Sequence, residues 1–396
     1  MLIGIIGKPS SGKSTFFKAA TLAEVAIASY PFTTIDANKG IGYVRIECAD
    51  KDFNTQCNPR FGYCINHVRF VPIQLIDVAG LVPDAHKGKG RGNQFLDDLR
   101  QADLLIHIVD ASGSTDEHGN PVKKLSHDPC KDIKFLDYEL DMWFLGILKK
   151  GWDKFSRQVH SENLNIKQQL AKQLSGLGVN DVMVEHSIKK FKLSHNPMDW
   201  KEDELMQLAS ELRKASKPFI IAANKIDIEG SEFNLHKMKE EFPDYLIIPC
   251  SGDSEVALRE AAKKGLISYL PGDDKFEITG KLNDAQKNAI NYIKKSVLDK
   301  HTSTGVQDVL DKAVFDFLKY IAIFPVENNK LTDKSGRILP DCFLMRDGST
   351  AYDFANKIHS DLAKHFIKAI NVKTKLAVGK DYKLKHRDVM EIVTSK

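Results

Sequence analysis

Short apolar runs alternate with polar loops and helical stretches over the first part of the chain. Residues 2–6 (LIGII) are apolar, a glycine-rich segment follows, and residues 16–28 (FFKAATLAEVAIA) have helical spacing. Further apolar runs at 68–76, 104–109 and 218–223 are typical of buried strands. This alternation predicts an α/β fold with a parallel sheet and crossover helices.

The span between residues 109 and 218 is too long for one crossover, and most of it has helical periodicity. The pattern covers 135–152, 155–174 and 200–215. We predict a helical, coiled-coil-like insertion and interpret its charge runs as solvated helix faces.

Helical patterns continue at 255–270, 282–298 and 304–321, and the character of the chain then changes. From residue 322, short β-like pieces surround one helical stretch at 350–369, which predicts a compact β-grasp module. The expected domains are the first part of the α/β domain at 1–133, the insertion at 134–212, the second part with trailing helices at 213–317, and the β-grasp module at 318–396.

Composition places few limits on function. The 396 residues are 42% hydrophobic and 28% charged, and 57 basic residues nearly balance 53 acidic ones. A net charge of +4 allows nucleic-acid contact without requiring it. No apolar run approaches the ~18 residues that cross a bilayer, and no signal segment is visible. We therefore expect a cytoplasmic protein with reduced cysteines and no membrane partner.

The glycine-rich segment matches the phosphate-binding pattern G-x-x-x-x-G-K-[ST]. It follows a predicted strand and opens a predicted helix, which is the context that the motif needs. Its backbone N–H groups would surround a β-phosphate, Lys13 would reach the β and γ oxygens, and the Ser14 hydroxyl would bind Mg²⁺. The predicted nucleotide-binding residues here are Gly7, Lys8, Pro9, Ser10, Ser11, Gly12, Lys13, Ser14 and Thr15.

Two further elements of a nucleotide switch follow at suitable spacing. Thr33 and Thr34 lie in a polar loop suited to closing over Mg²⁺ and the γ-phosphate. Asp77 ends the apolar run 68–76, where a carboxylate would hold Mg²⁺ through water, and the Gly80 N–H would contact the γ-phosphate.

The segment AANKID at 222–227 predicts guanine recognition. A carboxylate at Asp227 would accept hydrogen bonds from guanine N1–H and its N2 amine, whereas adenine offers an acceptor at N1 and no N2 amine. Asn224 would brace the loop, and the stem of Lys225 would cover the base. Ser251 and Gly252 occupy the place of a last guanine-contacting loop.

These motifs resemble the Obg superfamily of GTPases and, within it, the YchF/Ola1 group of archaeal type. The resemblance rests on GKPSSGKST, YPFTTIDANKG, DVAGLVPDAHKGKGRGNQFLDDLRQAD and a C-terminal stretch similar to a TGS domain. It implies a P-loop G domain with a helical insertion, and ribosome or RNA association. It also favours Thr34 over Thr33 as the threonine at Mg²⁺ and the γ-phosphate.

Two features separate this sequence from the proteins that it resembles. Many YchF/Ola1 relatives have a degraded Asn-Lys-x-Asp motif and use ATP, whereas Asn224, Lys225 and Asp227 are intact here, which favours GTP. Related potassium-stimulated GTPases have asparagine where this chain has Ser10, so the resemblance does not imply potassium stimulation.

Leu81 occupies the place of the glutamine that orients water in Ras-type enzymes. A hydrophobic residue there recurs in the resembled superfamily, so we expect slow intrinsic hydrolysis supported by charge stabilisation. The predicted catalytic residues are Lys13, Thr34, Gly80, His86 and His118, with the two histidines as candidates to position water or as plain surface residues. The predicted metal ligands are Ser14, Thr34 and Asp77.

Two features remain open. Cys48, Cys57 and Cys64, with His67 nearby, allow free thiols, a disulfide or a zinc site, and their spacing is not that of a usual short knuckle. From residue 318 onward, 15 Lys or Arg face 9 Asp or Glu, which suggests a phosphate-backbone surface or a solvated basic face.

The favoured function is a Mg²⁺-dependent GTPase switch that binds GTP and GDP and acts on the ribosome or ribosomal RNA, with a monomer as the default state. The alternatives are an ATPase of the Ola1 type and a nucleotide-dependent scaffold with negligible turnover.

Overall fold

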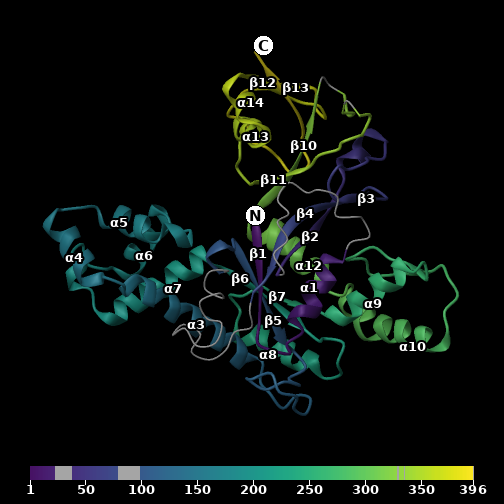
Figure 1. Cartoon of the computed structure of the whole chain (residues 1–396), viewed down its shortest axis with the longest axis horizontal. Helices are drawn as coiled ribbons and strands as arrows, with labels where there is room; N and C mark the ends of the chain where they lie inside the picture. Colours follow the sequence, from purple (N-terminus) through teal and green to yellow (C-terminus); the bar gives the residue numbers. More distant parts are fainter. Residues whose placement is uncertain (23–37, 79–98, 328–329, 334, 396) are drawn as a thin grey trace. The chain divides into compact units, whose positions relative to one another are not determined.

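The computed structural model describes residues 1–396 except 23–37, 79–98, 328–329, 334 and 396 (Figure 1). The described chain divides into two compact units. The first contains residues 1–19, 38–40, 74–78 and 99–306, and the second contains residues 20–22, 41–73 and 307–396 apart from the exceptions just given.

A seven-stranded sheet has the order β2-β4-β1-β5-β6-β7, with β3 paired to β4. The strands are β1 Leu2–Ile6, β2 Lys39–Glu47, β3 Tyr63–Ile65, β4 Val68–Asp77, β5 Leu104–Asp110, β6 Phe219–Asn224 and β7 Ile247–Pro249. β1 pairs in parallel with β4 and β5, and β6 pairs in parallel with β5 and β7. The four strands predicted from apolar runs are therefore confirmed. The loops that follow β1, β4, β5 and β6 start at the same edge of the sheet, where α/β proteins bind ligands.

Amphipathic helices supply much of the core of the first unit. They include α1 Lys13–Thr21, α3 Cys130–Lys149, α7 Glu202–Ser216, α8 Ser231–Glu241 and α9 Gly252–Lys263. In α3 the buried residues Ile133, Leu136, Leu140 and Phe144 recur at helical spacing and join the same core as sheet residues such as Val109. This packing fixes the start of α3 close to the loop after β5.

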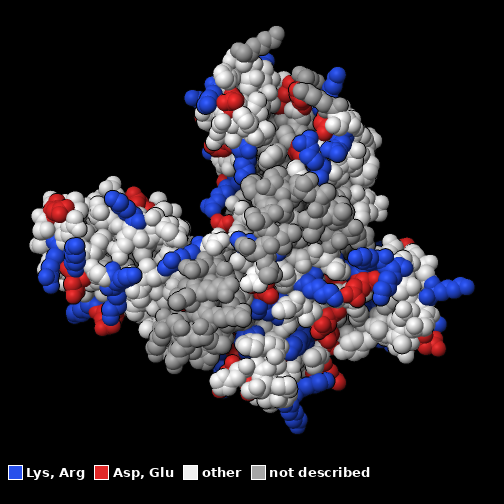
Figure 2. Space-filling view, in the orientation of Figure 1, with Lys and Arg blue, Asp and Glu red and all other residues white. Residues whose placement is uncertain are grey.

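The span 134–212, predicted to be a helical insertion, contains most of α3 and α7, and shorter helices lie between them. They are α4 Trp152–Ser161, α5 Ile166–Gln173 and α6 Asp181–Phe191, with 3₁₀ turns η3 Ser175–Leu177 and η4 Pro197–Asp199. The single helical stretch expected at 155–174 is wrong, because α4 ends before Asn163, which has a left-handed φ of 49°. Trp152 and Trp200 stack at a centroid distance of 5.5 Å and close this small core. Lys and Arg mix with Asp and Glu on its visible face (Figure 2).

The segment after α9 is more broken than its periodicity suggests. Its elements are β8 Ile267–Ser268, β9 Glu277–Ile278, α10 Asp284–Ile293, η5 Lys294–Leu298, α11 Asp299–His301, α12 Val306–Asp311 and η6 Lys312–Phe317. The helix predicted at 255–270 ends at Lys263, and Gly265 then takes a φ of 67° that reverses the chain. The pattern at 304–321 runs too far, because β10 begins at Tyr320.

The C-terminal module has a five-stranded sheet in the order β11-β10-β14-β12-β13. Its elements are β10 Tyr320–Val326, β11 Phe343–Arg346, α13 Ala351–Ile358, α14 Ser360–Lys364, β12 Phe366–Asn371, β13 Leu376–Val378 and β14 Val389–Thr394. The one helix expected at 350–369 is wrong, because β12 pairs with β13 and β14 from Phe366 onward. Phe354 of α13 is fully buried in the core of this module.

The described helices were also searched for membrane spans. None combines the length and the hydropathy that crossing a bilayer requires.

Candidate nucleotide-binding site

The phosphate-binding loop lies between β1 and α1, as its motif predicts. Gly12 has a φ of 89°, and a Cβ there would lie 2.2 Å from Asn224 Nδ2. A Cβ on Gly7 would lie 2.7 Å from the Ile108 carbonyl oxygen. Both glycines are therefore required by close approach of the chain, and at Gly12 by the left-handed backbone as well.

Lys13 and Asp77 contact each other where this loop ends and α1 begins. Lys13 Nζ contacts Asp77 Oδ1, and neither side chain is more than about a fifth exposed, at 14% and 21%. Asp77 ends β4, and its N–H donates to the Asn38 carbonyl oxygen at 2.7 Å. Ser14 lies in the first turn of α1 and is exposed. The loop thus gathers an ammonium, a carboxylate and a hydroxyl at the carboxyl edge of the sheet.

Asn224 joins the phosphate-binding loop to the loop before α9. Its Nδ2 donates to the Ser11 carbonyl oxygen at 3.0 Å, and its Oδ1 accepts from the Gly252 N–H at 3.0 Å. Asn224 is nearly buried, so both hydrogen bonds are shielded from water. These two hydrogen bonds are of the kind that the predicted bracing role of Asn224 requires.

Asp227 is oriented by two neighbours. Ser251 Oγ donates to Asp227 Oδ1 at 2.7 Å, and Tyr292 Oη donates to the Asp227 carbonyl oxygen at 2.7 Å. Ser251 is also the N-cap of α9, accepting from the Ser254 N–H. A carboxylate fixed from one side in this manner presents its other lone pairs to a ligand.

Lys225 is held by a residue that sequence reasoning missed. Its Nζ lies 2.9 Å from Asp110 Oδ2, and Asp110 is fully buried at the end of β5. Burial opposes the charged carboxylate, but hydrogen bonds from Ser112, Lys225 and Thr115 outweigh it and lower the pKa of Asp110. The only sequence signal was a lone aspartate ending an apolar run.

The loop after β5 packs directly on the phosphate-binding loop. Lys8 Nζ donates to the Thr115 carbonyl oxygen at 2.8 Å and pairs with Asp132 Oδ2 at 2.8 Å. Gly119 has a φ of 85°, and a Cβ there would lie 2.6 Å from the Pro9 carbonyl oxygen. The side chain of Lys8 is therefore engaged with protein groups, so that any contact of Lys8 with a nucleotide would come from its backbone.

His118 lies in this same loop, one residue before Gly119. Its N–H donates to Asp116 Oδ1 at 2.9 Å, while its side chain is 62% exposed. His118 is therefore the neighbour in sequence of Gly119, which lies against Pro9. Among the described residues, the only ion-pair partner of the His118 side chain is the carboxylate of Glu117.

Comparisons with known proteins agree with these motifs. The 50S ribosome-binding GTPase family matches residues 2–136, the G4 motif-containing domain of the Obg-like GTPase YGR210-like family matches 222–328, and the TGS domain matches 331–394. A GTP-binding protein of Methanocaldococcus jannaschii is 48% identical over 100% of this chain and 99% of its own. The chain belongs to the YchF/Obg-like GTPase family.

Two other members extend the likeness. The crystal structure of a GTP-binding protein from Pyrococcus horikoshii OT3 matches with a TM-score of 0.79 and 40% identity, covering 100% of both chains. The ribosome-binding ATPase YchF of Bacillus subtilis is 28% identical over 93% of this chain and 87% of its own. The predicted fold, a P-loop G domain followed by a TGS domain, is confirmed.

Within this YchF/Obg-like protein, the structure brings most predicted site residues to one edge of the sheet. These are Gly7 to Thr15, Asp77, Asn224, Lys225, Asp227, Ser251 and Gly252. Thr33, Thr34, Gly80, Leu81 and His86 lie outside the described residues, so their roles stay predictions. The structure adds two residues that the sequence did not suggest, Asp110 beside Lys225 and Tyr292 beside Asp227.

Proposed function

We propose that this protein is a Mg²⁺-dependent GTPase switch with slow intrinsic hydrolysis that acts on the ribosome or ribosomal RNA. The observation that carries the proposal is the oriented Asp227 beside an intact Asn224 and Lys225. Together with the loop from Gly7 to Ser14, these groups provide complementary contacts for both ends of a guanine nucleotide.

Guanine specificity follows from the chemistry of Asp227. An ionised carboxylate only accepts hydrogen bonds, and guanine offers two adjacent donors, whereas adenine presents an acceptor at the same edge. A site built around a hydrogen bond rejects a base that lacks the donor, because the bound base would cover the acceptor and leave it unpaired. We therefore expect GTP and GDP to bind much more tightly than ATP.

Nucleotide titration with fluorescent GDP, GTP and ATP tests this step. Asp227→Asn should weaken GTP binding and gain affinity for xanthosine triphosphate, whose C2 carbonyl accepts from the asparagine amide. Asp299→Asn, on an exposed helix of the same unit, is the matched control. Equal GTP and ATP affinities in the wild type would contradict guanine selection and favour the ATPase alternative, which the name of the Bacillus subtilis relative supports.

The residues available for Mg²⁺ fit a hard cation. The Ser14 hydroxyl and the Asp77 carboxylate are oxygen donors at the same loop, and Thr34 is the proposed third ligand. Bound Mg²⁺ would neutralise developing charge on the phosphates. Lys13, now paired with Asp77, would supply its positive charge to the β and γ oxygens, and the backbone N–H groups would orient them.

Hydrolysis without a glutamine depends on another way of aligning water. His86 and His118 are the proposed candidates within the chain, and a ribosomal group is the alternative. GTP turnover with and without ribosomes in wild type, His86→Ala and His118→Ala tests them. Unchanged hydrolysis rates in both variants would exclude the hypothesis that either histidine positions the attacking water. A single-turnover assay without any phosphate release would instead support the scaffold alternative.

Ribosome or RNA association rests on the basic C-terminal module and on a matching family and a relative whose names include ribosome binding. Part of the basic excess is committed elsewhere, because Arg387 pairs with Glu47 and Asp52 and Lys373 pairs with Asp52. Lys380 and Lys385 are exposed. Reversing both charges should weaken ribosome pelleting at low salt and flatten its salt dependence. Lys263→Glu with Lys264→Glu, at the C-terminal end of α9, should do neither.

The proposed domain limits remain 1–133 and 213–317 for the G domain, 134–212 for the helical insertion and 318–396 for the TGS domain. We also propose a cytoplasmic monomer. Light scattering of the purified chain with GDP and with a slowly hydrolysed GTP analogue tests the monomer.

A further inference from the structure

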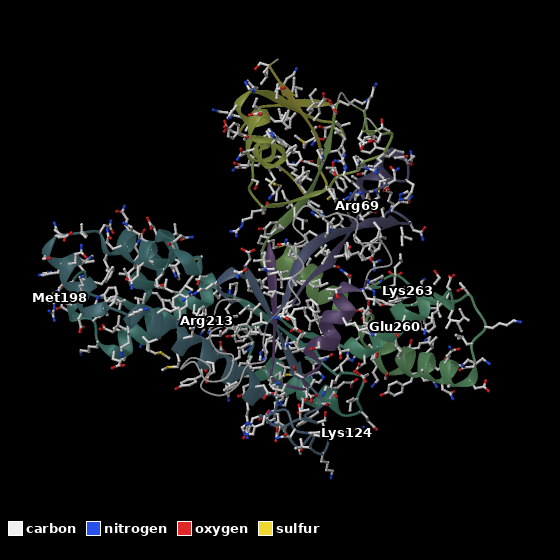
Figure 3. The ribbon with its side chains drawn as sticks, viewed as in Figure 1. Arg69, Lys124, Met198, Arg213, Glu260 and Lys263 are labelled. Atoms are coloured by element: carbon white, nitrogen blue, oxygen red, sulfur yellow. The ribbon has the colours of Figure 1, made fainter. Side chains whose placement is uncertain are left out.

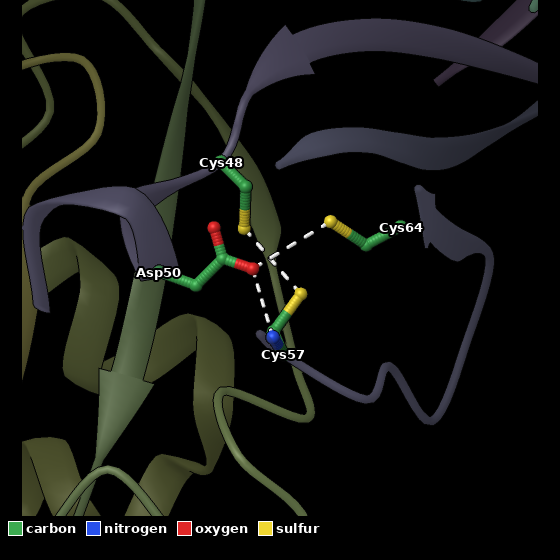
Figure 4. A group of neighbouring side chains, drawn as sticks. All are labelled: Cys48, Asp50, Cys57 and Cys64. Carbon is green, nitrogen blue, oxygen red and sulfur yellow. Dashed lines mark hydrogen bonds between the residues drawn. The ribbon is translucent and has the colours of Figure 1, made fainter. Parts of the chain in front are cut away.

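Three thiols and one carboxylate converge in the segment between β2 and β4 (Figure 4). The ligand atoms of Cys48, Asp50, Cys57 and Cys64 all lie within 4.8 Å of one another. Cys48 Sγ lies 3.5 Å from Cys57 Sγ, and Cys64 Sγ lies 3.7 Å from Asp50 Oδ2. All four belong to the second unit.

The local chain path explains why residues of such irregular spacing meet. Cys48 directly follows β2, Asp50 lies in the 3₁₀ turn η1 Ala49–Phe53, Cys57 lies in the next loop, and Cys64 is in β3. Asn66 and His67 take positive φ values of 50° and 63° in the turn from β3 to β4. The Cys48 N–H donates to the His67 carbonyl oxygen at 2.7 Å, so this turn folds back onto Cys48.

The separations suit a tetrahedral metal. With Zn–S bonds of about 2.3 Å, two thiolates on one tetrahedron lie about 3.8 Å apart, and a thiolate and a carboxylate oxygen lie slightly closer. The observed 3.5 and 3.7 Å are near these edges. A disulfide needs a sulfur separation of about 2.05 Å and would leave the third thiol unused. All three cysteines are free in the structure.

The surroundings also resemble those of a metal centre. Asp50 is fully buried. Its Oδ1 lies 3.0 Å from His67 Nδ1, and its Oδ2 accepts from the Cys57 N–H at 2.8 Å. Arg69 is 1% exposed and donates from Nη1 to Cys57 Sγ at 3.4 Å. Groups that orient ligands and offset negative charge in this way are typical around thiolate sites.

We propose that Cys48, Asp50, Cys57 and Cys64 form a zinc site. Four protein ligands leave no open position, so the site is structural rather than catalytic. Binding releases the thiol protons, and Arg69 balances part of the charge of three thiolates and one carboxylate around Zn²⁺, while His67 contacts the Asp50 carboxylate and orients it. The sequence suggested His67 as a fourth ligand beside the three cysteines. In the proposed site the fourth ligand is Asp50, and His67 contacts Asp50 instead.

Within the second unit, the zinc site would fix a segment that binds the C-terminal module. The Asn58 N–H donates to the Ile338 carbonyl oxygen at 3.0 Å, and the Arg60 N–H donates to that of Pro340 at 2.9 Å. Arg69 donates to the carbonyl oxygens of Leu339 and Pro340 at 3.0 and 2.9 Å. Metal binding would thus order the loop that carries these contacts, independently of nucleotide.

Metal analysis of the full chain tests the proposal. The protein is expressed with added Zn²⁺, purified under reducing conditions without chelator, and analysed by mass spectrometry for metals. We expect one zinc per chain, and loss of that zinc in Cys64→Ser, whose position is only half-buried. Cys130→Ser, in α3 of the other unit, is the matched control and should retain zinc.

Two measurements keep the test decisive if a variant folds poorly. Co²⁺ added to metal-free wild-type protein should give the thiolate charge-transfer absorption and the intense visible bands of tetrahedral coordination. His67→Ala should weaken zinc binding by roughly 10- to 100-fold in competition with a chelator. Absence of zinc and of the cobalt spectrum in folded wild-type protein, or a native Cys48–Cys57 disulfide in intact-mass analysis, would overturn the proposal.

Discussion

Asn224 Nδ2 donates to the carbonyl oxygen of Ser11 at 3.0 Å, and this hydrogen bond joins the base-reading loop to the phosphate-binding loop. The same side chain accepts from the Gly252 N–H. One amide therefore sets the distance between the contacts proposed for the two ends of the nucleotide. The arrangement makes the affinity for nucleotide sensitive to a residue that need not touch the phosphates.

Asn224→Ala should weaken nucleotide binding strongly. Loss of both buried hydrogen bonds leaves the Gly252 N–H and the Ser11 carbonyl unpaired, at a cost of about 2–3 kcal/mol or roughly 30- to 150-fold in Kd. Titration with fluorescent GDP measures the change. Asn291→Ala, on the exposed face of α10, should bind as wild type does. An unchanged Kd for Asn224→Ala would show that the two loops keep their spacing without it.

Gly119→Ala should weaken nucleotide binding through a steric effect on the phosphate-binding loop. The new Cβ would lie 2.6 Å from the Pro9 carbonyl oxygen, and the alanine would have to keep a φ of 85°, which is unfavourable for a residue with a side chain. One of the two loops must therefore shift. We expect about a tenfold rise in the Kd for GDP, from strain of about 1–2 kcal/mol.

The matched control for this prediction is Gly265→Ala. Gly265 has a φ of 67°, but a Cβ there would meet nothing within 4 Å. This variant therefore carries backbone strain without the clash and should lose stability while keeping its affinity for GDP. Equal affinities of the two variants would refute the packing argument.

The local part of the fold and site could be predicted from sequence. Phosphate-binding loops need two glycines, a lysine and a hydroxyl at fixed spacing, so Gly7, Gly12, Lys13 and Ser14 are recognisable without a structure. Buried parallel strands such as β5 are short apolar runs with defined ends, and their positions were correct. The guanine-reading motif is equally local.

Residues that act through long-range contacts could not be found in this way. Asp110 pairs with Lys225 across 115 positions, and nothing near either residue specifies the pair. Asp50 joins the cysteine cluster because η1 turns it inward, a consequence of tertiary packing. The strand β12 was mistaken for helix because residues 366–369 continue an amphipathic period, and its partners β13 and β14 come later in the chain.

Asp311 should make the stability of the second unit fall as pH rises toward neutrality. Burial raises the pKa of its carboxyl to about 7, against hydrogen bonds from the Arg45 N–H and Gln307 that lower it. Because the folded-state pKa lies above the unfolded value of about 3.9, the stabilising effect is complete below pH ~4. It is lost as pH rises to about 7.

Asp311→Asn should remove this dependence, since asparagine keeps the acceptor without a charge. At pH 8 we expect a gain of about 1–3 kcal/mol over wild type, shrinking toward zero or reversing at pH 4. Thermal melts across this pH range measure the difference. Asp316→Asn, exposed and close in sequence, provides the comparison. A difference in melting temperature between wild type and Asp311→Asn that is the same at every pH would contradict the assigned pKa.

Arg213 should be essential for attaching the helical insertion to the sheet. It lies on α7 (Figure 3), is 1% exposed, and donates to Asp141 and Asp137 of α3 at 2.7 Å each. Tyr245 donates to the same Asp137, and the guanidinium lies over the ring of Phe219 in β6. One buried cation thus connects two helices and a strand.

Arg213→Ala should destabilise the protein by about 3–5 kcal/mol, because two partly buried carboxylates lose their cation. Arg213→Lys should fall between, since an ammonium cannot reach both carboxylates with the planar geometry of a guanidinium. Urea denaturation followed by tryptophan fluorescence reports the loss, because Trp143, Trp152 and Trp200 all lie in or beside the insertion. Lys214→Ala, exposed on the next position of α7, should change stability by less than about 0.5 kcal/mol. If Arg213→Ala and Lys214→Ala unfolded at the same urea concentration, the carboxylates would be satisfied by water, and the cation would not hold α3 against α7.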